Sequence, residues 1–291
     1  MSIVDTVLRL LLAVVVAPWV GMLLVGLDRK LSARLQGRVG PPLTQPFYDL
    51  VKLLAKQGDS TSRFQTACLA LFLASNVVSL ALVLMGGDLL VMLFVLAFGA
   101  VAYIVGGFSA KSPYSQLGTQ RELLQLLTYE PLLVFLAVGI YLRTGSFLAS
   151  AAFSHAEPLL PEMPVFVLTL IAVFGIKLRK SPFDIASSPH HGHQEVVRGP
   201  LSEVAGPSLA LVELAHWYEV VLLVALASLL WASPIWAGAL VGLGCLLASI
   251  VVDNVAARLT WSWMLRFGWL VAVPASILNL IYLYATRGGG G

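Results

Sequence analysis

The chain has 291 residues, of which 58% are hydrophobic and only 11% are charged, and its formal net charge is +3. Its apolar residues gather in runs long enough to cross a bilayer, which favours one all-α integral membrane protein over soluble domains. The few basic residues are scattered between these runs and give little support to nucleic-acid binding. Two cysteines, Cys68 and Cys245, stand alone inside apolar runs, and the sequence has no CxxC pair. We therefore expect buried packing thiols and no iron–sulfur or thiolate-bound metal site in this chain.

Eight apolar runs predict about eight transmembrane helices in a single bundle over residues 1–287, with the glycine tail 288–291 set aside. The first run is interpreted as a retained helix, because Arg9 is the only basic residue before it and no small-residue cleavage site follows. The fifth run is short and bounded by charge. The predicted spans are residues 10–27, 67–85, 89–108, 123–141, 163–177, 209–231, 235–252 and 267–284.

The basic residues predict the orientation of the bundle. All but three of the 18 lysines and arginines fall in or beside the connections after spans one, three, five and seven; the exceptions are Arg9, Arg143 and Arg287. By the positive-inside rule these connections face the cytoplasm, and both termini lie outside the cell inner membrane. Cytoplasmic docking loops are therefore expected at about residues 28–66 and 178–208.

The first of these loops contains an amphipathic segment. A helix of this kind lies in the membrane interface rather than crossing it. Two roles remain open for this helix: a simple surface anchor or a docking element for a partner. The predicted apolar side carries Phe47, Leu50, Val51, Leu53 and Leu54, and the polar side carries Asp49, Lys52 and Lys56.

Acidic residues and histidines concentrate between residues 181 and 219. Carboxylates are costly beside hydrocarbon, so this segment needs water or a partner protein. The cluster His190, His191 and His193 suggests a metal site, but its spacing on a loop flanked by Pro and Gly favours a solvated or partner-facing segment. The segment includes Asp184, Glu195, Glu203, Glu213, Glu219 and four of the five histidines of the chain.

Two predicted spans carry ionisable residues at helical spacing. In the fourth span Glu122, Gln125 and Tyr129 share one face, and Glu130 follows Tyr129. In the sixth, Glu213, His216 and Glu219 are spaced by three. These groups are expected to point into the bundle. They either pair with neighbouring groups and specify helix packing, or form a relay of protonatable side chains; two such helices below an acidic loop favour the relay.

The chain resembles the H-type membrane subunits of NADH–quinone oxidoreductase (complex I) and their relatives in membrane-bound, energy-converting nickel–iron hydrogenases. Tyr129-Glu130 fits the tyrosine–glutamate pair of the family, and Pro182-Phe183-Asp184 fits its P-F-D motif. Two longer motifs also fit: R-x-G-P…Q…D-x-x-K at Arg38, Gly40, Pro41, Gln45, Asp49 and Lys52, and E-x-x-x-G-x-x-x-E-x-x-G at Glu195, Gly199, Glu203 and Gly206.

The tract HQEVVRGPLSEVAGPSLAL resembles the hydrogenase branch more closely, including the formate hydrogenlyase and Ech types. Two departures from the family pattern accompany it. The segment IASSPHHGHQ after P-F-D is longer and less acidic than in complex I members. In the sixth span His216 takes the place aligned with the family's glutamate, and Glu213 is taken as the nearest acid.

The resemblance implies a membrane anchor and energy-coupling subunit that is not catalytic alone and binds no metal or cofactor. The NiFe centre and the 4Fe–4S clusters would sit on a large subunit and a small iron–sulfur subunit, docked on the cytoplasmic side. Electrons from ferredoxin or a similar donor would reduce protons to hydrogen, and antiporter-like membrane subunits would move protons or sodium ions. The expected coupling residues are Asp184, Glu195, Glu203, Glu130, Glu213, His216, Glu122 and Tyr129; the expected docking residues are Arg34, Arg38, Gln45, Asp49, Lys52, His190, His191, His193 and Arg198.

Three alternatives belong to other classes. A quinone-site subunit of a complex I-type NADH, F420H2 or ferredoxin oxidoreductase would show quinone-dependent, inhibitor-sensitive activity. A stand-alone secondary transporter would be expected to show internal inverted repeats, and none is apparent in the sequence. A passive anchor would tolerate charge-neutral replacement of its buried acids without any effect on coupling.

Overall fold

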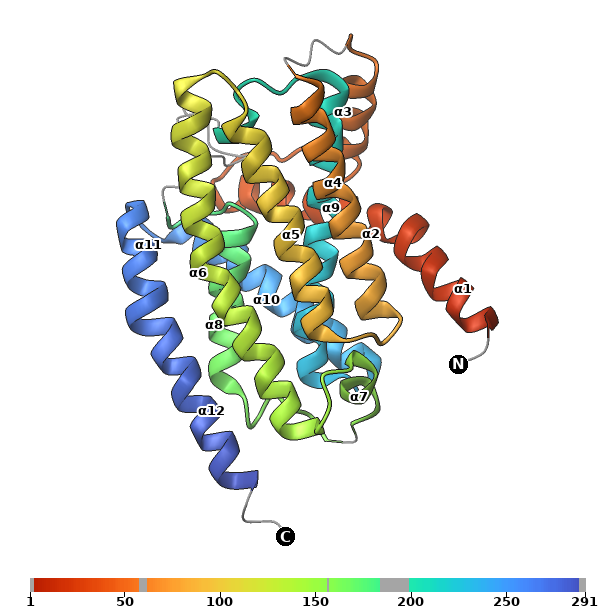
Figure 1. The fold of residues 1–291 in the computed structure, drawn as a ribbon, viewed down its shortest axis with the longest axis vertical. Helices are drawn as coiled ribbons and strands as arrows, with labels where there is room; N and C mark the ends of the chain where they lie inside the picture. Colours follow the sequence, from red (N-terminus) through yellow and green to blue (C-terminus); the bar gives the residue numbers. More distant parts are fainter. Residues whose placement is uncertain (1–2, 58–61, 156, 184–198, 288–291) are drawn as a thin grey trace.

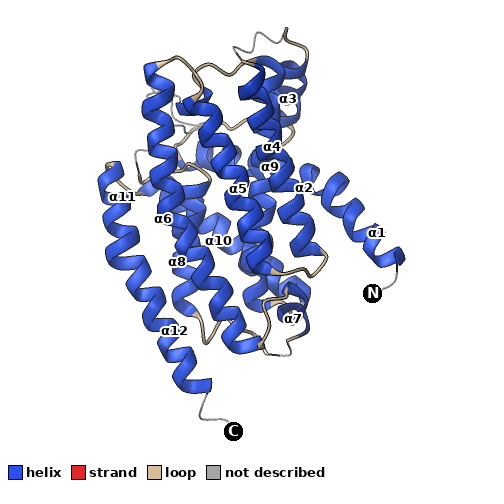
Figure 2. Ribbon diagram, viewed as in Figure 1, coloured by secondary structure: helices blue, strands red, loops and turns tan. Residues whose placement is uncertain are grey.

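The computed structural model describes residues 3–57, 62–155, 157–183 and 199–287, and this part of the chain is a bundle of helices without strands (Figures 1 and 2). Its elements, in chain order, are α1 Ile3–Leu11, η1 Leu12–Val16, α2 Ala17–Leu35, α3 Gln45–Leu54, α4 Arg63–Leu84, α5 Leu89–Phe108, α6 Pro113–Thr144, α7 Ala149–Ser154, α8 Pro164–Lys177, η3 Gly199–Leu201, α9 Gly206–Ser228, η4 Leu229–Trp231, α10 Ile235–Val255, α11 Trp261–Phe267, η5 Gly268–Ala272 and α12 Val273–Arg287.

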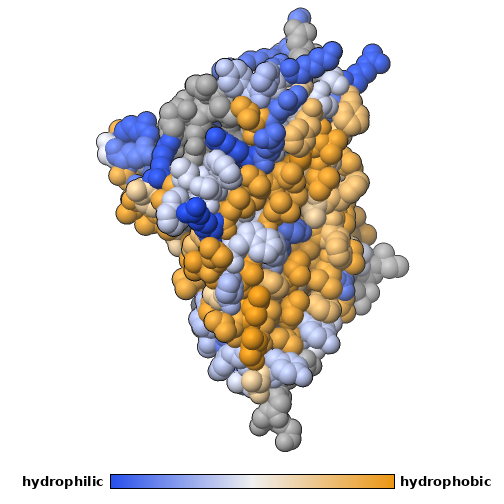
Figure 3. All heavy atoms as spheres, turned by 60° about the vertical axis from the view of Figure 1, so that its left-hand side comes forward, coloured by the Kyte–Doolittle hydropathy of each residue, from blue (hydrophilic) through white to orange (hydrophobic). Residues whose placement is uncertain are grey.

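Within the described residues, seven helical stretches are long and apolar enough to cross a membrane. They coincide with seven of the eight predicted spans. The eighth, α8, has 14 residues and would rise only about 21 Å, against a hydrocarbon core of about 30 Å. The predicted all-α membrane fold is confirmed, with α8 as a short helix of the bundle. An apolar belt between more polar ends is visible on the surface in Figure 3.

Several helices extend beyond their predicted ends. The first span runs over Asp5–Leu35 rather than 10–27, so Asp28 lies within α2 and not in a loop. The fourth runs over Pro113–Thr144 rather than 123–141. A sequence run marks only the apolar part of a helix, whereas the hydrogen-bonded helix continues into the polar region that the apolar pattern does not cover.

Successive connections between the long helices lie at alternate ends of the bundle, as predicted. Leu89 N donates to Phe147 O at 2.8 Å, which joins the α4–α5 turn to the segment after α6. At the same end Arg9 contacts Leu84 O in α4, and Asn279 of α12 contacts Glu162 O. Both terminal helices therefore begin or finish at this end, and the basic connections lie at the other.

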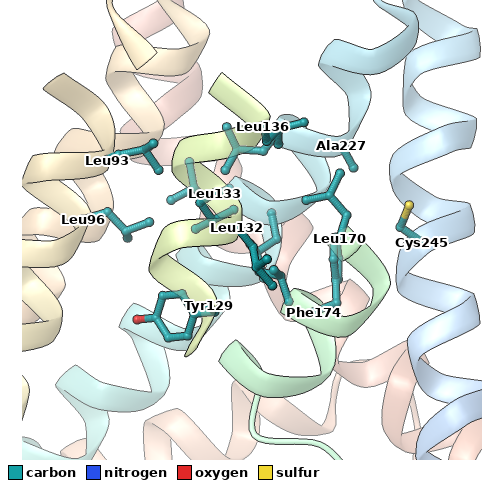
Figure 4. Packing of buried hydrophobic residues seen from close by; sticks show 14 of the residues in the cluster. Leu93, Leu96, Tyr129, Leu132, Leu133, Leu136, Leu170, Phe174, Ala227 and Cys245 are labelled. Atoms are coloured by element: carbon teal, nitrogen blue, oxygen red, sulfur yellow. The ribbon is translucent and has the colours of Figure 1, made fainter. Parts of the chain in front are cut away.

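α6 lies at the centre of the hydrophobic core. Leu132 and Leu136 pack between α5 on one side and α8 and α9 on the other (Figure 4). Cys68 and Cys245 are both buried, as expected of packing thiols. α2 and α9 approach closely because Gly21 has no side chain: a Cβ there would lie 2.2 Å from Trp217 O.

Candidate functional site: a buried ion-pair cluster at the end of α8

Helix α8 ends in a tight turn, and three basic side chains at this turn point in different directions. Lys180 N donates to Gly175 O at 2.8 Å and Arg179 N donates to Ile176 O at 3.2 Å, the bond pattern of a Schellman motif. Arg179 occupies the left-handed position with φ of 56°, where glycine is usual. A bulky residue in this conformation is strained, and such strain persists only where the surroundings hold it.

Each basic side chain forms an ion pair with an acid from a different helix. Lys177 Nζ lies 3.1 Å from Glu219 Oε1 of α9, and both side chains are 2% exposed. The other two pairs of this α8 cluster are Arg179 with Glu122 of α6 at 2.8 Å and Lys180 with Asp28 of α2 at 2.7 Å. In addition, Ser181 N donates to Asp253 Oδ1 of α10 at 2.7 Å. The end of α8 is thus joined to three helices by ion pairs and to α10 by a hydrogen bond from a backbone N–H.

Two aromatic rings support the basic groups of the cluster. Lys177 Nζ donates to Tyr129 Oη at 3.5 Å and lies 4.8 Å from the ring centroid. The Arg179 guanidinium lies 5.1 Å from the Tyr103 ring, a distance at which the face of an aromatic ring attracts a cation. Burial opposes the charge of Arg179, but the Glu122 carboxylate raises the pKa of the guanidinium well above its ordinary value. Arg179 is therefore a fixed positive charge.

The predicted polar face of the fourth span is observed. Glu122, Gln125 and Tyr129 are all buried and line one small cavity with Lys177 and Glu219. Its volume of about 20 Å³ is enough for a single water, which needs about 10–15 Å³ and two to four polar partners. Tyr103 Oη, Gln125 Nε2 and Glu219 Oε2 have no hydrogen-bond partner among the described residues. A water here would connect the Arg179 and Lys177 ion pairs.

In the sixth span the acid that joins the cluster is Glu219, not Glu213. Glu219 Oε2 lies 3.6 Å from His216 Nδ1, too far for a hydrogen bond but close enough for an ion pair when His216 is protonated. Glu213 is half-buried and lies six residues earlier in α9. Glu213 and His216 therefore stand beside the cluster, and Glu219 is at its centre.

Glu130 lies next to the cluster without an ion-pair partner among the described residues. Its side chain interacts electrostatically with Lys177, and Glu130 Oε2 is buried without a hydrogen bond. A carboxylate oxygen left unpaired at this depth is costly unless water or a proton satisfies it. Glu130 is therefore a second acid near Lys177 at the edge of the α8 cluster.

The predicted docking residues of the first loop divide into two groups. Asp49 holds α3 against α2 by pairing with Arg29 at 2.5 Å. Gln45, on the same helix, donates from Nε2 to Asp49 at 3.0 Å and orients its carboxylate. Arg34, Arg38 and Lys52 are exposed, although Arg38 contacts Gln36. The first pair therefore positions the helix, and the second group remains open to a partner.

The amphipathic helix is confirmed as α3, but its predicted apolar side is divided. Phe47, Leu50 and Leu53 pack against the two core clusters. Val51 is 47% exposed and Leu54 is 57% exposed. A ten-residue helix lying on the bundle can bury only one stripe of its surface, so its other apolar residues face outward.

Several predicted site residues lie outside the described part of the chain: Asp184, Glu195, His190, His191, His193 and Arg198. Glu203 is described and half-buried, between η3 and α9. In the described ranges, no group of three histidine, cysteine, aspartate or glutamate residues is placed to hold a metal ion.

The sequence interpretation overlooked the basic half of the cluster. Their position after an apolar run predicts that Lys177, Arg179 and Lys180 are charges of a cytoplasmic loop, whereas all three are buried. A signal was present, because three basic residues within four positions directly follow an apolar run, and acids lie in or beside other spans. Charges that deep in a membrane protein require partners of opposite sign.

Comparisons with known proteins agree with this architecture. A family model described as NADH dehydrogenase matches residues 8–284. Hydrogenase-4 component C of Escherichia coli is 30% identical over 79% of this chain and 76% of its own. The H subunit of NADH-quinone oxidoreductase from Rubrobacter xylanophilus is 28% identical over 90% of this chain and 88% of its own.

A solved structure of the membrane-bound sulfane sulfur reductase, an archaeal respiratory membrane complex, contains a chain with the same fold. The TM-score is 0.85 at 21% identity, and the match covers 96% of this chain and 99% of that one. The family model spans all the described helices except the first residues of α1 and the last of α12, and with the hydrogenase-4 relative it establishes that the chain belongs to the NADH dehydrogenase family of membrane subunits.

Proposed function

We propose that this chain is the membrane anchor and energy-coupling subunit of a multisubunit membrane-bound NiFe hydrogenase in the cell inner membrane. Its relatives establish the coarser point that it is a membrane subunit of a hydrogenase- or complex I-like oxidoreductase. The observation that carries the coupling role is the α8 cluster, in which three buried ion pairs join α8 to α9, α6 and α2. The hydrogenase assignment is supported by the 30% identity to hydrogenase-4 component C.

The cluster has the physical properties of a coupling element. At 3.1 Å and an effective dielectric constant of about 20, the Lys177–Glu219 attraction is about 5 kcal/mol. Moving one charge through 100 mV requires about 2.3 kcal/mol. Loss of the Lys177–Glu219 attraction is therefore comparable in energy to moving about two charges through 100 mV.

In this proposal a charge change in a docked redox subunit alters the electrostatic potential at the loop end of the bundle. Arg179 stays charged, so the response falls on groups that can change protonation, namely Glu122, Glu219, Glu130 and His216. The single-water cavity between Glu122 and Glu219 would supply the bridge for a proton. The resulting rearrangement would pass to neighbouring antiporter-like subunits that move protons or sodium ions.

The redox metals belong to partner subunits in this account. The only two thiols of the chain, Cys68 and Cys245, are on different helices, whereas iron–sulfur clusters need groups of cysteine ligands. The NiFe large subunit and the small 4Fe–4S subunit would dock at the exposed basic residues Arg34, Arg38 and Lys52. Their electron donor would be ferredoxin or a similar carrier.

A second candidate is the quinone-site subunit of a complex I-type oxidoreductase. It is favoured by one observation: the match to the NADH-quinone oxidoreductase relative spans 90% of this chain, against 79% for the hydrogenase-4 relative. In that case the same cluster would couple ion movement to quinone reduction.

Purification of the chain with its native partners tests the proposal. We expect nickel and iron in the complex, hydrogen evolution from a reduced dye, and no metal on the chain once its partners are stripped away. A complex without nickel that reduces quinones in an inhibitor-sensitive manner would refute the hydrogenase assignment and establish the second candidate.

A further inference from the structure

A large apolar groove lies between α8, α10 and the α11–α12 helix. It shares no lining residue with the small cavity between Glu122 and Glu219. Its volume is about 680 Å³, within the range of about 300–1,000 Å³ typical of ligand sites. It opens toward the surrounding membrane, because Leu168 on one wall is 69% exposed and Leu270 on the other is 71% exposed.

The groove runs inward from the basic end of the bundle. At that end its floor is closed by the chain after α8, where Leu259 N donates to Pro182 O at 2.6 Å and the rings of Phe183 and Phe267 lie 6.0 Å apart. On α8 its lining extends from Gly175 back to Leu168, which is about 10 Å of helix. The groove is therefore elongated along the membrane normal.

Charge is present only at the rim. Of the 15 lining residues, Arg266 alone is charged and none is acidic. The Arg266 guanidinium is exposed, lies 5.6 Å from the Trp263 ring, and has no acidic partner among the described residues. Arg258, next to the lining residue Leu259, is also exposed. Tryptophan and arginine at this depth are typical of the level of lipid headgroups.

We propose that this groove binds one membrane phospholipid with a net negative headgroup, with one of its acyl chains between α8 and the α11–η5 segment and its phosphate at Arg266. An apolar slot open to lipid suits an acyl chain, and an unpaired guanidinium suits a phosphate with two acceptor oxygens. A quinone tail would fit the apolar slot equally well, but it would leave the positive rim without a counter-charge. The charge therefore selects the phospholipid.

The test uses the full chain within its detergent-purified complex, depleted of lipid and then offered phosphatidylglycerol, phosphatidylcholine or ubiquinone. Native mass spectrometry counts retained molecules on wild type, Arg266→Gln, and the control Arg63→Gln, an exposed arginine at the same end of the bundle. We expect retention of one phosphatidylglycerol, weakened about fivefold by R266Q, which corresponds to about 1 kcal/mol for one surface cation. R63Q should retain the lipid as wild type does.

A second variant, Ala172→Trp, fills the groove without changing charge, and Leu240→Trp places the same side chain on an exposed face of α10. A172W should lose phosphatidylglycerol while L240W keeps it. The proposal is overturned if R266Q and R63Q retain phosphatidylglycerol equally, if phosphatidylcholine is retained as well as phosphatidylglycerol, or if ubiquinone is held in preference to both.

Discussion

Breaking the Lys177–Glu219 pair by Glu219→Gln should be among the most destabilising single changes in the chain. Both side chains are 2% exposed and the two charged atoms are 3.1 Å apart, so the variant leaves a buried ammonium without its ion-pair partner and with only the more distant Glu130 near it. Removal of one partner of such a pair typically costs about 3–5 kcal/mol. Lys177→Met should cost a similar amount, because it leaves the buried Glu219 carboxylate without its lysine partner.

The double variant Lys177→Met with Glu219→Gln should recover most of this loss. Neither residue is then charged, and apolar or neutral replacements of a whole buried pair are often close to neutral in stability. The double-mutant cycle should therefore give a coupling free energy of about 3 kcal/mol or more. The measurement is unfolding of the solubilised chain in mixed micelles, followed by tryptophan fluorescence.

The Arg29–Asp49 pair supplies a matched control, since its side chains are 19% and 40% exposed. The cycle of Arg29→Gln and Asp49→Asn should give a coupling of only about 0.2–1 kcal/mol, as for other solvent-exposed pairs. Equal, small coupling energies for the two pairs would refute the claim that the α8 cluster is a strongly coupled buried network.

Three further predictions concern single features. Arg179→Gly should be more stable than Arg179→Ala by about 1 kcal/mol, because both lose the Glu122 pair but only glycine relieves the left-handed backbone; thermal midpoints showing the reverse order would contradict the assigned strain. Gly21→Ala should destabilise by about 1–3 kcal/mol through contact with Trp217 O, whereas Gly244→Ala, which meets nothing within 4 Å, should be neutral or stabilising; equal effects in the same unfolding assay would argue against close α2–α9 packing. The double variant Cys68→Ala with Cys245→Ala should leave the nickel and iron content of the complex unchanged by elemental analysis, and a loss of either metal would show that this chain supplies a ligand.

The span positions were predictable because lipid imposes a simple pattern. Apolar runs of membrane length located seven long helices and the short α8, and the polar face of Glu122, Gln125 and Tyr129 followed from helical spacing. The alternation of the two ends also followed, because each span reverses the chain direction.

The partners of the charges were not predictable in the same way. Pairing of Arg179 with Glu122 depends on a left-handed turn at a non-glycine residue. No local sequence pattern predicts such a turn. The choice of Glu219 over Glu213 depends on the rotation of α9 relative to α8. Both are properties of tertiary packing. Helical spacing therefore shows which acids lie on the same face of a helix, but it does not show which of them pairs with a given basic residue.

The central claim, that buried acids of this chain couple a partner's redox reaction to ion movement, is tested most directly in proteoliposomes containing the whole complex. Hydrogen evolution from a reduced dye and ion uptake are measured together for Glu130→Gln and Glu203→Gln, with the exposed residue Glu157→Gln as control. The account predicts that E130Q and E203Q keep dye-linked hydrogen evolution but lose ion uptake, while E157Q keeps both. Ion uptake at the control level in both E130Q and E203Q would contradict it.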